Sequence, residues 1–291
     1  MAMYVAKETK AHYAIYDAHT DHYRPERLVL VGELRRAIEE GELVLHYQPK
    51  ATLADGEVRG VEALVRWQHP ERGLVPPDVF VPVAEQTGLI RPLTLFVVDQ
   101  ALRQCREWRE QGLDLTVAVN VAMRNILDER FPEELAELLE RHGLEAEILE
   151  LELTETSVLA DPPRAKAILQ RLRETGVKLA VDDFGTGYAS LAYLSELPVD
   201  EIKIDRSFVT AMDSHEQYAR IVRSTIDLGR NLALSVVAEG VETGAVWSKL
   251  TELGCDSAQG YFLARPLPAD ELTPWLRERA CSEPGAAQTA A

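Results

Sequence analysis

The chain has 291 residues, 46% of them hydrophobic, and its 48 acidic against 31 basic side chains give a formal net charge of -17. This acidity argues against a surface that binds polymeric nucleic acid, because phosphates would be repelled. No stretch approaches the roughly 20 apolar residues of a membrane span, and no secretion signal is recognisable. Three widely spaced cysteines without a C-x-x-C pair favour neither a disulfide framework nor a structural zinc site. We therefore expect a cytoplasmic protein, or one tethered to a membrane through an upstream region.

The two ends of the chain differ in composition from the middle. Residues 1–24 indicate a helix and a short strand without a core of their own, and residues 25–40 indicate a charged amphipathic linker helix. Residues 41–279 make up the main predicted domain. Residues 280–291, "ACSEPGAAQTAA", are small and polar and predict a disordered tail.

Short β-rich runs alternate with helical patterns through the main domain. The expected strands are Leu43–Gln48, Gly60–Arg66, Leu115–Val121, Ile148–Leu153, Val177–Asp182, Glu201–Ile204, Leu234–Ala238 and Ala258–Phe262. The expected helices include Leu93–Gln111, Pro132–His142, Pro163–Thr175 and Ser207–Leu232. Asp161-Pro162 and Gly176 provide the start and stop signals of the third helix. This alternation predicts an α/β fold, a TIM-like (β/α)8 barrel.

The first expected strand is connected to the second in an unusual way. Only a turn at Asp55-Gly56 separates the two strands. Parallel neighbours need a crossover of a dozen or more residues, so this short link indicates a hairpin. The first strand of the barrel is therefore expected to be antiparallel to the second.

Charged and amide side chains recur at or near the ends of the expected strands. They are Glu62, Asn120, Glu152, Glu155, Asp182, Asp183, Lys203, Asp205, Glu239, Glu242 and Gln259. Since the carboxyl ends of barrel strands form the rim that carries chemistry, we expect these groups at one mouth of the barrel. So many like charges are unfavourable without cations, and hard oxygen ligands without His or Cys select Mg²⁺, Mn²⁺ or Ca²⁺ over zinc. A pair of ions bridged by Asp182 would suit the cleavage of a phosphate ester.

Several motifs resemble one known family in their order and spacing. They are "HYQPK", "EALVRW", "VNVAMR", "LELTET", "DDFGTGYASL", "LPVDEIKIDRSFV", "VVAEGVET" and "CDSAQGYFLARPLP", spread from about Leu28 to Leu276. Together they resemble the EAL-domain cyclic di-GMP phosphodiesterases. The resemblance implies a TIM-like barrel with an antiparallel first strand. It also implies an enzyme that uses a metal-activated water to hydrolyse cyclic di-GMP to linear pGpG.

The resemblance also implies a role for each site residue. Glu62, Asn120, Glu152 and Asp182 would bind one metal ion, Asp182 and Asp183 a second ion, and Glu239 would support the second ion or its water. Glu62, Glu239 and Lys203 would form the catalytic set, with Lys203 beside the attacking water. Gln48, Arg66, Asp205 and Gln259 would contact the substrate, while Glu155 and Glu242 would support the loop and the pocket. The implied cofactor is Mg²⁺ or Mn²⁺, with Ca²⁺ as an inhibitor.

The resemblance extends to partners. "AMYVAKETKAHYAIYD" resembles the end of a GGDEF domain, which implies an upstream GGDEF or sensor domain in a longer tandem protein. An unrelated N-terminal helix is the alternative. A homodimer formed through the region of the DDFGTG loop is also implied.

Two other functions are compatible with parts of the pattern. A catalytically silent cyclic di-GMP receptor would bind without hydrolysis, but degenerate members of that kind lose metal ligands that this chain keeps. A barrel lyase or aldolase that stabilises an enolate with Mg²⁺ would need a similar acidic cluster, but it leaves Gln48, Arg66 and the DDFGTG loop unexplained.

Overall fold

The structure is a computed structural model that describes residues 25–155, 161–187 and 191–281. Its helices are α2 (Pro25–Glu40), α3 (Pro77–Thr87), α4 (Ile90–Glu110), α5 (Met123–Ile126), α6 (Phe131–His142), η1 (Ala146–Ile148), α8 (Pro162–Thr175), α9 (Leu191–Leu194), α10 (Arg206–Ala211), α11 (Glu216–Leu232), α12 (Gly244–Leu253) and α13 (Ala269–Cys281). Its strands are β1 (Leu43–Thr52), β2 (Val58–His69), β3 (Gly73–Val75), β4 (Thr116–Asn120), β5 (Leu149–Thr154), β6 (Lys178–Phe184), β7 (Glu201–Ile204), β8 (Ser235–Ala238), β9 (Ser257–Gln259) and β10 (Leu267–Pro268).

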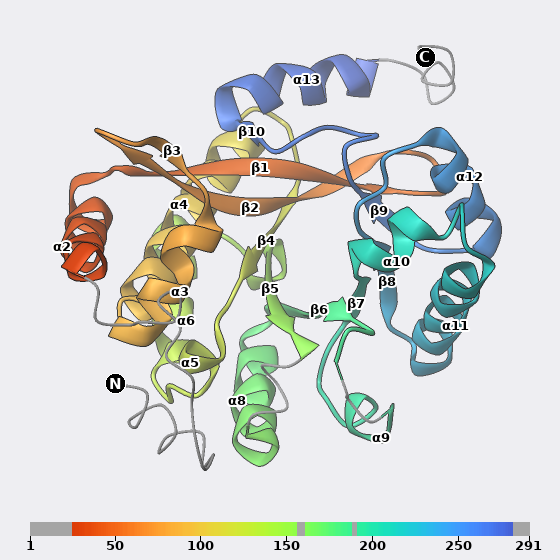
Figure 1. The fold of residues 1–291 in the computed structure, drawn as a ribbon, viewed down its shortest axis with the longest axis horizontal. Helices are drawn as coiled ribbons and strands as arrows, with labels where there is room; N and C mark the ends of the chain where they lie inside the picture. Colours follow the sequence, from red (N-terminus) through yellow and green to blue (C-terminus); the bar gives the residue numbers. More distant parts are fainter. Residues whose placement is uncertain (1–24, 156–160, 188–190, 282–291) are drawn as a thin grey trace.

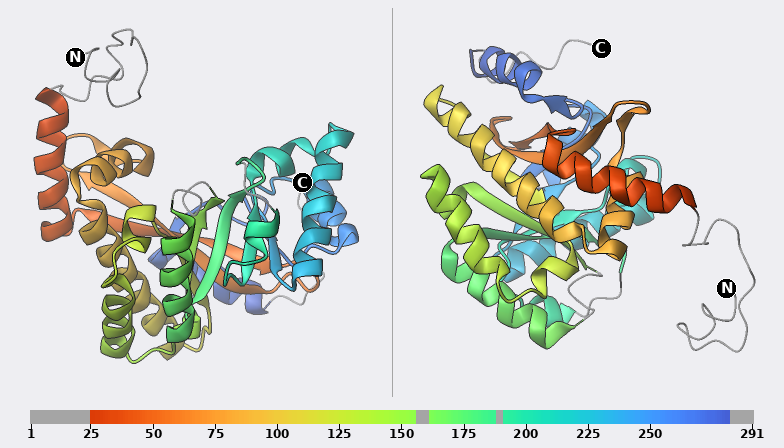
Figure 2. Two further views of the ribbon diagram at one scale, coloured as in Figure 1. Left: turned by 90° about the horizontal axis from the view of Figure 1, so that it is seen from below. Right: turned by 90° about the vertical axis from the view of Figure 1, so that its left-hand side faces the viewer.

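Eight strands close into a barrel, as the sequence predicts. Neighbouring strands pair in the order β1, β2, β4, β5, β6, β7, β8 and β9, and β9 pairs with β1 to complete the circle. The short strands β3 and β10 extend the sheet beside β2 and β1. Figure 1 shows α4 and α6 on one side of this barrel, α8 below it, and α11 and α12 on the other side, and Figure 2 gives two further views of the same arrangement. The predicted (β/α)8 architecture is confirmed.

The first strand runs against its neighbours. β1 pairs antiparallel with both β2 and β9, while the pairs from β2 through β4 to β9 are parallel. The β1–β2 turn is closed by a hydrogen bond from the amide of Thr52 to the carbonyl of Glu57, 3.0 Å, and Gly56 lies within the turn. The predicted hairpin is thus confirmed.

The helices cover the barrel with their apolar faces. In α4 the buried residues recur three or four positions apart, and Trp108 packs edge-on against Tyr47 of β1 with ring centroids 4.9 Å apart. The predicted end signals of α8 are present. Asp161 accepts a hydrogen bond from the amide of Arg164, and Gly176 ends the helix at φ 95°, in the left-handed region that favours glycine.

One predicted helix is wrong. The expected helix over 207–232 is divided into α10 and α11, because residues 212–214 form a turn and His215 is extended. Within this turn the hydroxyl of Ser214 donates to the carbonyl of Ala211, 3.3 Å, and Met212 is buried. A serine that bonds a nearby carbonyl competes with the helical ladder. Asp213-Ser214 was the sequence signal for the break.

The predicted boundaries also need two corrections. The last barrel strand was expected over 258–262, but β9 ends at Gln259, and residues 260–262 form a bend and a turn. A Cβ at Gly260 would lie 2.3 Å from the amide nitrogen of Val241, so the chain leaves the sheet where two backbones meet closely. The predicted tail began at residue 280, yet α13 continues to Cys281.

The N-terminal helix α2 packs against the barrel wall. Leu34 and Ala37 are fully buried, and the carboxylate of Glu33 lies 3.4 Å from Nε2 of His69 in β2. The predicted elements of residues 1–24 and the rest of the predicted tail, residues 282–291, lie outside the described residues. The division of the chain into domains stays a prediction. Among the described helices, none has both the length and the apolar composition needed to cross a bilayer.

The contact of α11 with β8 leads to a stability prediction. A Cβ at Gly229 would lie 2.3 Å from Cγ2 of Val236, whereas a Cβ at Gly32 in α2 would meet no atom within 4 Å. We expect Gly229→Ala to lower the free energy of unfolding by about 1–3 kcal/mol through overpacking. The matched change Gly32→Ala should raise it by about 0.5–1 kcal/mol. Urea unfolding measures both, and equal effects of the two substitutions would contradict this packing.

Candidate functional site

A lysine lies at the centre of the polar cluster in the barrel mouth. Lys203, on β7, has no exposed side-chain surface, and its Nζ lies 2.8 Å from Oε1 of Glu152 and 2.6 Å from Oε1 of Glu239. It also lies 3.5 Å from Oδ1 of Asp182 and 3.8 Å from Oε2 of Glu62. Four carboxylates from β5, β6, β2 and the end of β8 thus surround one ammonium group.

Amide side chains extend this cluster to one side. Glu62 accepts hydrogen bonds from Nδ2 of Asn120, at 2.7 Å, and from Nε2 of Gln259. Nε2 of Gln259 also donates to Oε1 of Gln48, 3.0 Å away, and Gln48 donates to the carbonyl of Ala264, 3.1 Å. The strand register explains the convergence, since Gln48 lies opposite Glu62 in the β1–β2 ladder.

An irregularity in β6 brings two consecutive aspartates to the same place. Successive side chains of a regular strand point to opposite faces, so Asp182 and Asp183 would be separated. The β6–β7 register shifts between Val181 and Phe184, and Asp183 has a φ of 53°. As a result, ligand oxygens of Asp182, Asp183 and Glu239 lie within 4.8 Å of one another. Bulges commonly re-aim side chains beside active sites in this way.

Glu155 holds the start of the DDFGTG loop. Its Oε2 accepts hydrogen bonds from the amides of Gly185, at 3.0 Å, and Gly187, at 3.2 Å. A Cβ at residue 187 would lie 2.7 Å from Oε1 of Glu155, so a larger residue here would displace this carboxylate. Residues 188–190, with which the motif continues, lie outside the described residues.

Three other predicted residues lie outside the group of carboxylates that contact Lys203. Asp205 caps α10, where it accepts from the amide of Ser207 at 3.0 Å. Arg66 is half-buried, and its guanidinium donates to the carbonyl of Val65, 2.8 Å. Glu242 is exposed, and within the described residues no hydrogen bond or ion pair joins it to the cluster. The structure therefore brings together the residues predicted to bind metal. Glu242, which was predicted to support the pocket, lies apart from them.

The pKa values reflect the crowding of charge. Burial raises the pKa of Glu152 well above its usual range, and the neighbouring carboxylates of Glu62 and Asp182 raise it further. Burial, Asp182 and Asp205 raise the pKa of Asp183 to about 6. Burial by itself would lower the pKa of Lys203, but the surrounding carboxylates outweigh it and raise this pKa well above the usual value. Lys203 is thus a permanent cation, and one cation is too few for its neighbours.

The donor set fits divalent cations. Asp182, Asp183 and Glu239 offer carboxylate oxygens close enough to share one ion. Oε1 of Glu152 faces the ammonium of Lys203 at 2.8 Å, while Oε2 is buried and, among the described residues, accepts no hydrogen bond. Buried oxygens without donors are costly, and hard oxygen ligands suit Mg²⁺, Mn²⁺ or Ca²⁺. The acidic group can therefore bind a metal.

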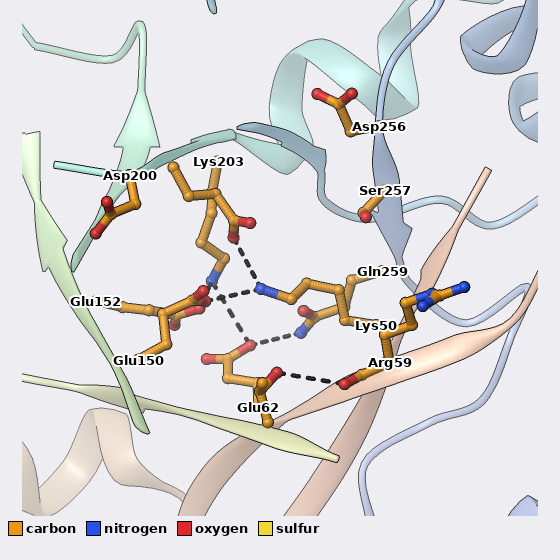
Figure 3. A network of polar contacts seen from close by, with 12 residues as sticks. Lys50, Arg59, Glu62, Glu150, Glu152, Asp200, Lys203, Asp256, Ser257 and Gln259 are labelled. Carbon is orange, nitrogen blue, oxygen red and sulfur yellow. Dashed lines mark hydrogen bonds and ion pairs between the residues drawn. The ribbon is translucent and has the colours of Figure 1, made fainter. Parts of the chain in front are cut away.

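A second buried ionic cluster was missed by the sequence interpretation. Nζ of Lys50 lies 2.7 Å from Oε1 of Glu150 and 2.8 Å from Oε1 of Glu201. Figure 3 shows Lys50 and Glu150 beside Lys203 and Glu152 in the same polar network. The sequence does contain a signal for it. Glu150 lies two residues before Glu152, and Glu201 two residues before Lys203, so each pair is expected on the same face of its strand.

Comparisons with known proteins match this geometry to a family. The EAL domain matches residues 31–266, which is most of the chain. The chain belongs to the EAL domain family. This EAL domain is 44% identical over 273 residues to the bifunctional diguanylate cyclase/cyclic di-GMP phosphodiesterase MucR of Pseudomonas aeruginosa, a match that covers 93% of this chain and 40% of MucR. It is 39% identical over 277 residues to the cyclic di-GMP phosphodiesterase PdeR of Escherichia coli, covering 95% of this chain and 42% of PdeR.

Solved structures agree with the fold of this EAL domain. The PaMucR phosphodiesterase in its c-di-GMP complex is 45% identical and has a TM-score of 0.80, with 84% of this chain and 99% of that chain covered. The EAL enzyme Bd1971, in its cAMP and cyclic-di-GMP bound form, is 30% identical with a TM-score of 0.82, with 86% of this chain and 69% of that chain covered. The chain spans less than half the length of the curated relatives it matches, 40% of the first and 35% of the next two.

The buried position of Lys203 leads to a prediction about stability and metal. Removing one partner of a buried ion pair costs about 3–5 kcal/mol, because the other partner is left uncompensated. We expect Lys203→Met to lose about this much free energy of unfolding in EDTA, and to regain a large part of it when Mn²⁺ is added. Chemical unfolding with and without Mn²⁺ measures the effect. The control Lys166→Met removes an exposed 2.8 Å pair with Glu196 and should change stability by less than about 1 kcal/mol. Loss of stability that Mn²⁺ does not reverse would contradict cation binding beside Lys203.

Proposed function

We propose that this EAL domain hydrolyses cyclic di-GMP to linear pGpG in a reaction that depends on Mg²⁺ or Mn²⁺. The observation that carries the proposal is the mouth of the barrel, where four carboxylates converge on the buried ammonium of Lys203. The names of the relatives MucR and PdeR support the choice of substrate.

We propose the metal ligands that the family resemblance implies, and the placement of the side chains supports the choice. Glu62, Asn120, Glu152 and Asp182 would hold one ion, and Asp182 with Asp183 a second, with Glu239 supporting the second ion or the water beside it. The short distances among the oxygens of Asp182, Asp183 and Glu239 support this arrangement. When bound, two divalent ions supply Lewis-acid chemistry, because they activate water and hold phosphoryl oxygens.

Lys203 stabilises charge in this proposal and does not act as a base. Its raised pKa keeps it protonated, so it can orient the attacking water or neutralise a phosphate oxygen but cannot accept a proton. The oxygen of water bonds to phosphorus, the bond from phosphorus to O3′ breaks, and a proton of the water ends on O3′, which leaves a 5′-phosphate and a 3′-hydroxyl on the linear product. We assign Glu62 to the catalytic set as well, and its Oε2 lies 3.8 Å from Nζ of Lys203.

The substrate contacts are assigned to the rim. Gln48 and Gln259 form a hydrogen-bonded pair that reaches Glu62, so each can exchange a partner for a nucleotide group. Arg66 carries a planar guanidinium suited to phosphate oxygens. We assign Asp205 to the substrate as well. Glu155 supports the loop through the amides of Gly185 and Gly187, and Glu242 completes the pocket from its exposed position.

Turnover of the dinucleotide tests the proposal directly. Purified protein with Mg²⁺ or Mn²⁺ is expected to convert cyclic di-GMP to pGpG, and chromatography separates the two. Glu62→Gln should reduce kcat by about a hundredfold or more, because it weakens a metal ligand and a partner of Lys203. Glu252→Gln, an exposed change on α12, is the matched control and should leave kcat unchanged. Calcium should support binding with little turnover, since its looser coordination positions water poorly.

Other outcomes of the same assay would favour another function. Tight binding without hydrolysis in either metal, unchanged by Glu62→Gln, would indicate a silent receptor. Failure to bind the dinucleotide together with activity on keto-acids would indicate a barrel lyase or aldolase. Full turnover with Ca²⁺ would contradict the coordination argument.

The whole protein is proposed to be a longer signalling enzyme. The chain spans 40% of MucR, which is named a bifunctional diguanylate cyclase/phosphodiesterase, so we propose an upstream GGDEF or sensor domain. We also propose a cytoplasmic location for this domain, where its dinucleotide substrate is found, and no polymeric nucleic acid as partner.

A homodimer through the DDFGTG region is the proposed assembly. Gly185 and Thr186 are exposed and Phe184 is half-buried, so this segment can meet a second copy. We expect a concentration-dependent dimer in sedimentation velocity, and Thr186→Lys should shift it toward the monomer through like-charge repulsion across the two-fold axis. The exposed change Thr251→Lys on α12 is the control. A monomer at all concentrations would reject the dimer.

A further inference from the structure

The floor of the barrel interior holds a second ionic cluster with a definite geometry. Lys50 of β1 pairs with Glu150 of β5 at 2.7 Å and with Glu201 of β7 at 2.8 Å. The three side chains are between 5% and 12% exposed, so the pairs lie largely out of water. Burial by itself would lower the pKa of Lys50, but Glu201 and Glu150 outweigh it and raise this pKa. Lys50 is therefore a cation that pairs with both carboxylates.

Each member of this cluster lies two residues from a residue of the mouth. Gln48 and Lys50 share β1, Glu150 and Glu152 share β5, and Glu201 and Lys203 share β7. Side chains two apart on a strand point to the same face. The floor cluster is therefore a lower layer of the barrel interior, beneath Gln48, Glu152 and Lys203.

The ion pairs cross the barrel and do not follow the sheet. β7 is separated from β1 by β8 and β9, and β5 is separated from β1 by β2 and β4. Ladder hydrogen bonds set the spacing of neighbouring strands, but the distance across the barrel depends on the side chains that fill it. Here the contacts of one ammonium with two carboxylates, at 2.7 and 2.8 Å, link three strands across the barrel.

We propose that Lys50, Glu150 and Glu201 are positioning residues for the phosphodiesterase reaction. Their pairing holds β1, β5 and β7 at the separation that places Gln48, Glu152 and Lys203 in working order. Stability alone does not explain the cluster, because buried ion pairs are commonly no more stable than apolar residues of similar volume. The proposal rests on the proposed function, since kcat is its main readout.

An apolar replacement of the whole cluster separates positioning from stability. The triple variant Lys50→Met, Glu150→Leu and Glu201→Leu is expected to unfold within about 5 °C of the wild type, because no buried charge is left unpaired. Its kcat should fall about ten- to a hundredfold, the effect of displacing reacting groups by about 1 Å, while KM changes less than about threefold. Wild-type kcat in the triple variant would overturn the proposal.

A second variant decides the case if the triple variant does not fold. Glu201→Asp keeps all three charges but shortens one side chain by a methylene, so it should fold and yet lower kcat by about tenfold. Glu201→Gln removes the charge but keeps the length of the side chain. Because the proposed role is positioning, its kcat should fall less than that of Glu201→Asp. Lys166→Met, which removes an exposed pair with Glu196, is the control and should leave kcat unchanged. Full activity of Glu201→Asp would overturn the proposal.

Crystal structures provide a readout that does not depend on activity. In the wild type, Nζ of Lys203 lies 2.8 Å from Oε1 of Glu152. We expect this contact to lengthen beyond hydrogen-bond distance in Glu201→Asp and in the triple variant. An unchanged contact in both would overturn the positioning role. If the wild type shows no turnover but the variants show this displacement, the proposed function is rejected and the positioning role is retained.

Discussion

The buried ammonium of Lys203 is the contact on which the site depends. Four carboxylates from four strands point at it, two of them within 2.8 Å. In a low-dielectric interior such a group of acids would repel and take up protons without a central cation. The same lysine is fully charged because its neighbours are acids. The ammonium of Lys203 reduces the repulsion among the four carboxylates but does not neutralise all of them. The remaining negative charge favours the binding of metal ions.

The barrel itself explains how residues from distant segments reach one another. Parallel strands place their carboxyl ends at one rim, and the antiparallel β1 brings Gln48 to the same interior through its pairing with β2. In a regular strand, however, the side chains of Asp182 and Asp183 would point to opposite faces of the sheet. The register shift in β6 and the left-handed backbone of Asp183 remove this obstacle, so local irregularity is part of the site.

Much of this arrangement is predictable from the sequence because the barrel strands are short apolar runs ending in acids or amides. The hairpin follows from the length of one loop. The break after α10 was missed because the apolar period continues across it, and Asp213-Ser214 reads as an ordinary surface pair. The floor cluster was missed for a different reason. Lys50 reads as part of a motif, and nothing in a single chain pairs it with Glu150, a hundred residues away.

The two layers of the barrel differ in how completely they neutralise themselves. In the floor, Lys50 faces two carboxylates, and close contact with both leaves a small excess of charge. In the mouth, Lys203 faces four. The excess of negative charge is thus larger in the mouth than in the floor. Such an excess attracts cations to the open end, because charged clefts with low-dielectric walls focus the electric field outward. The floor cluster carries the smaller excess of negative charge and suits a positioning role. The larger excess of the mouth can be relieved by cations or by protons, in keeping with the raised pKa values of Glu152 and Glu239.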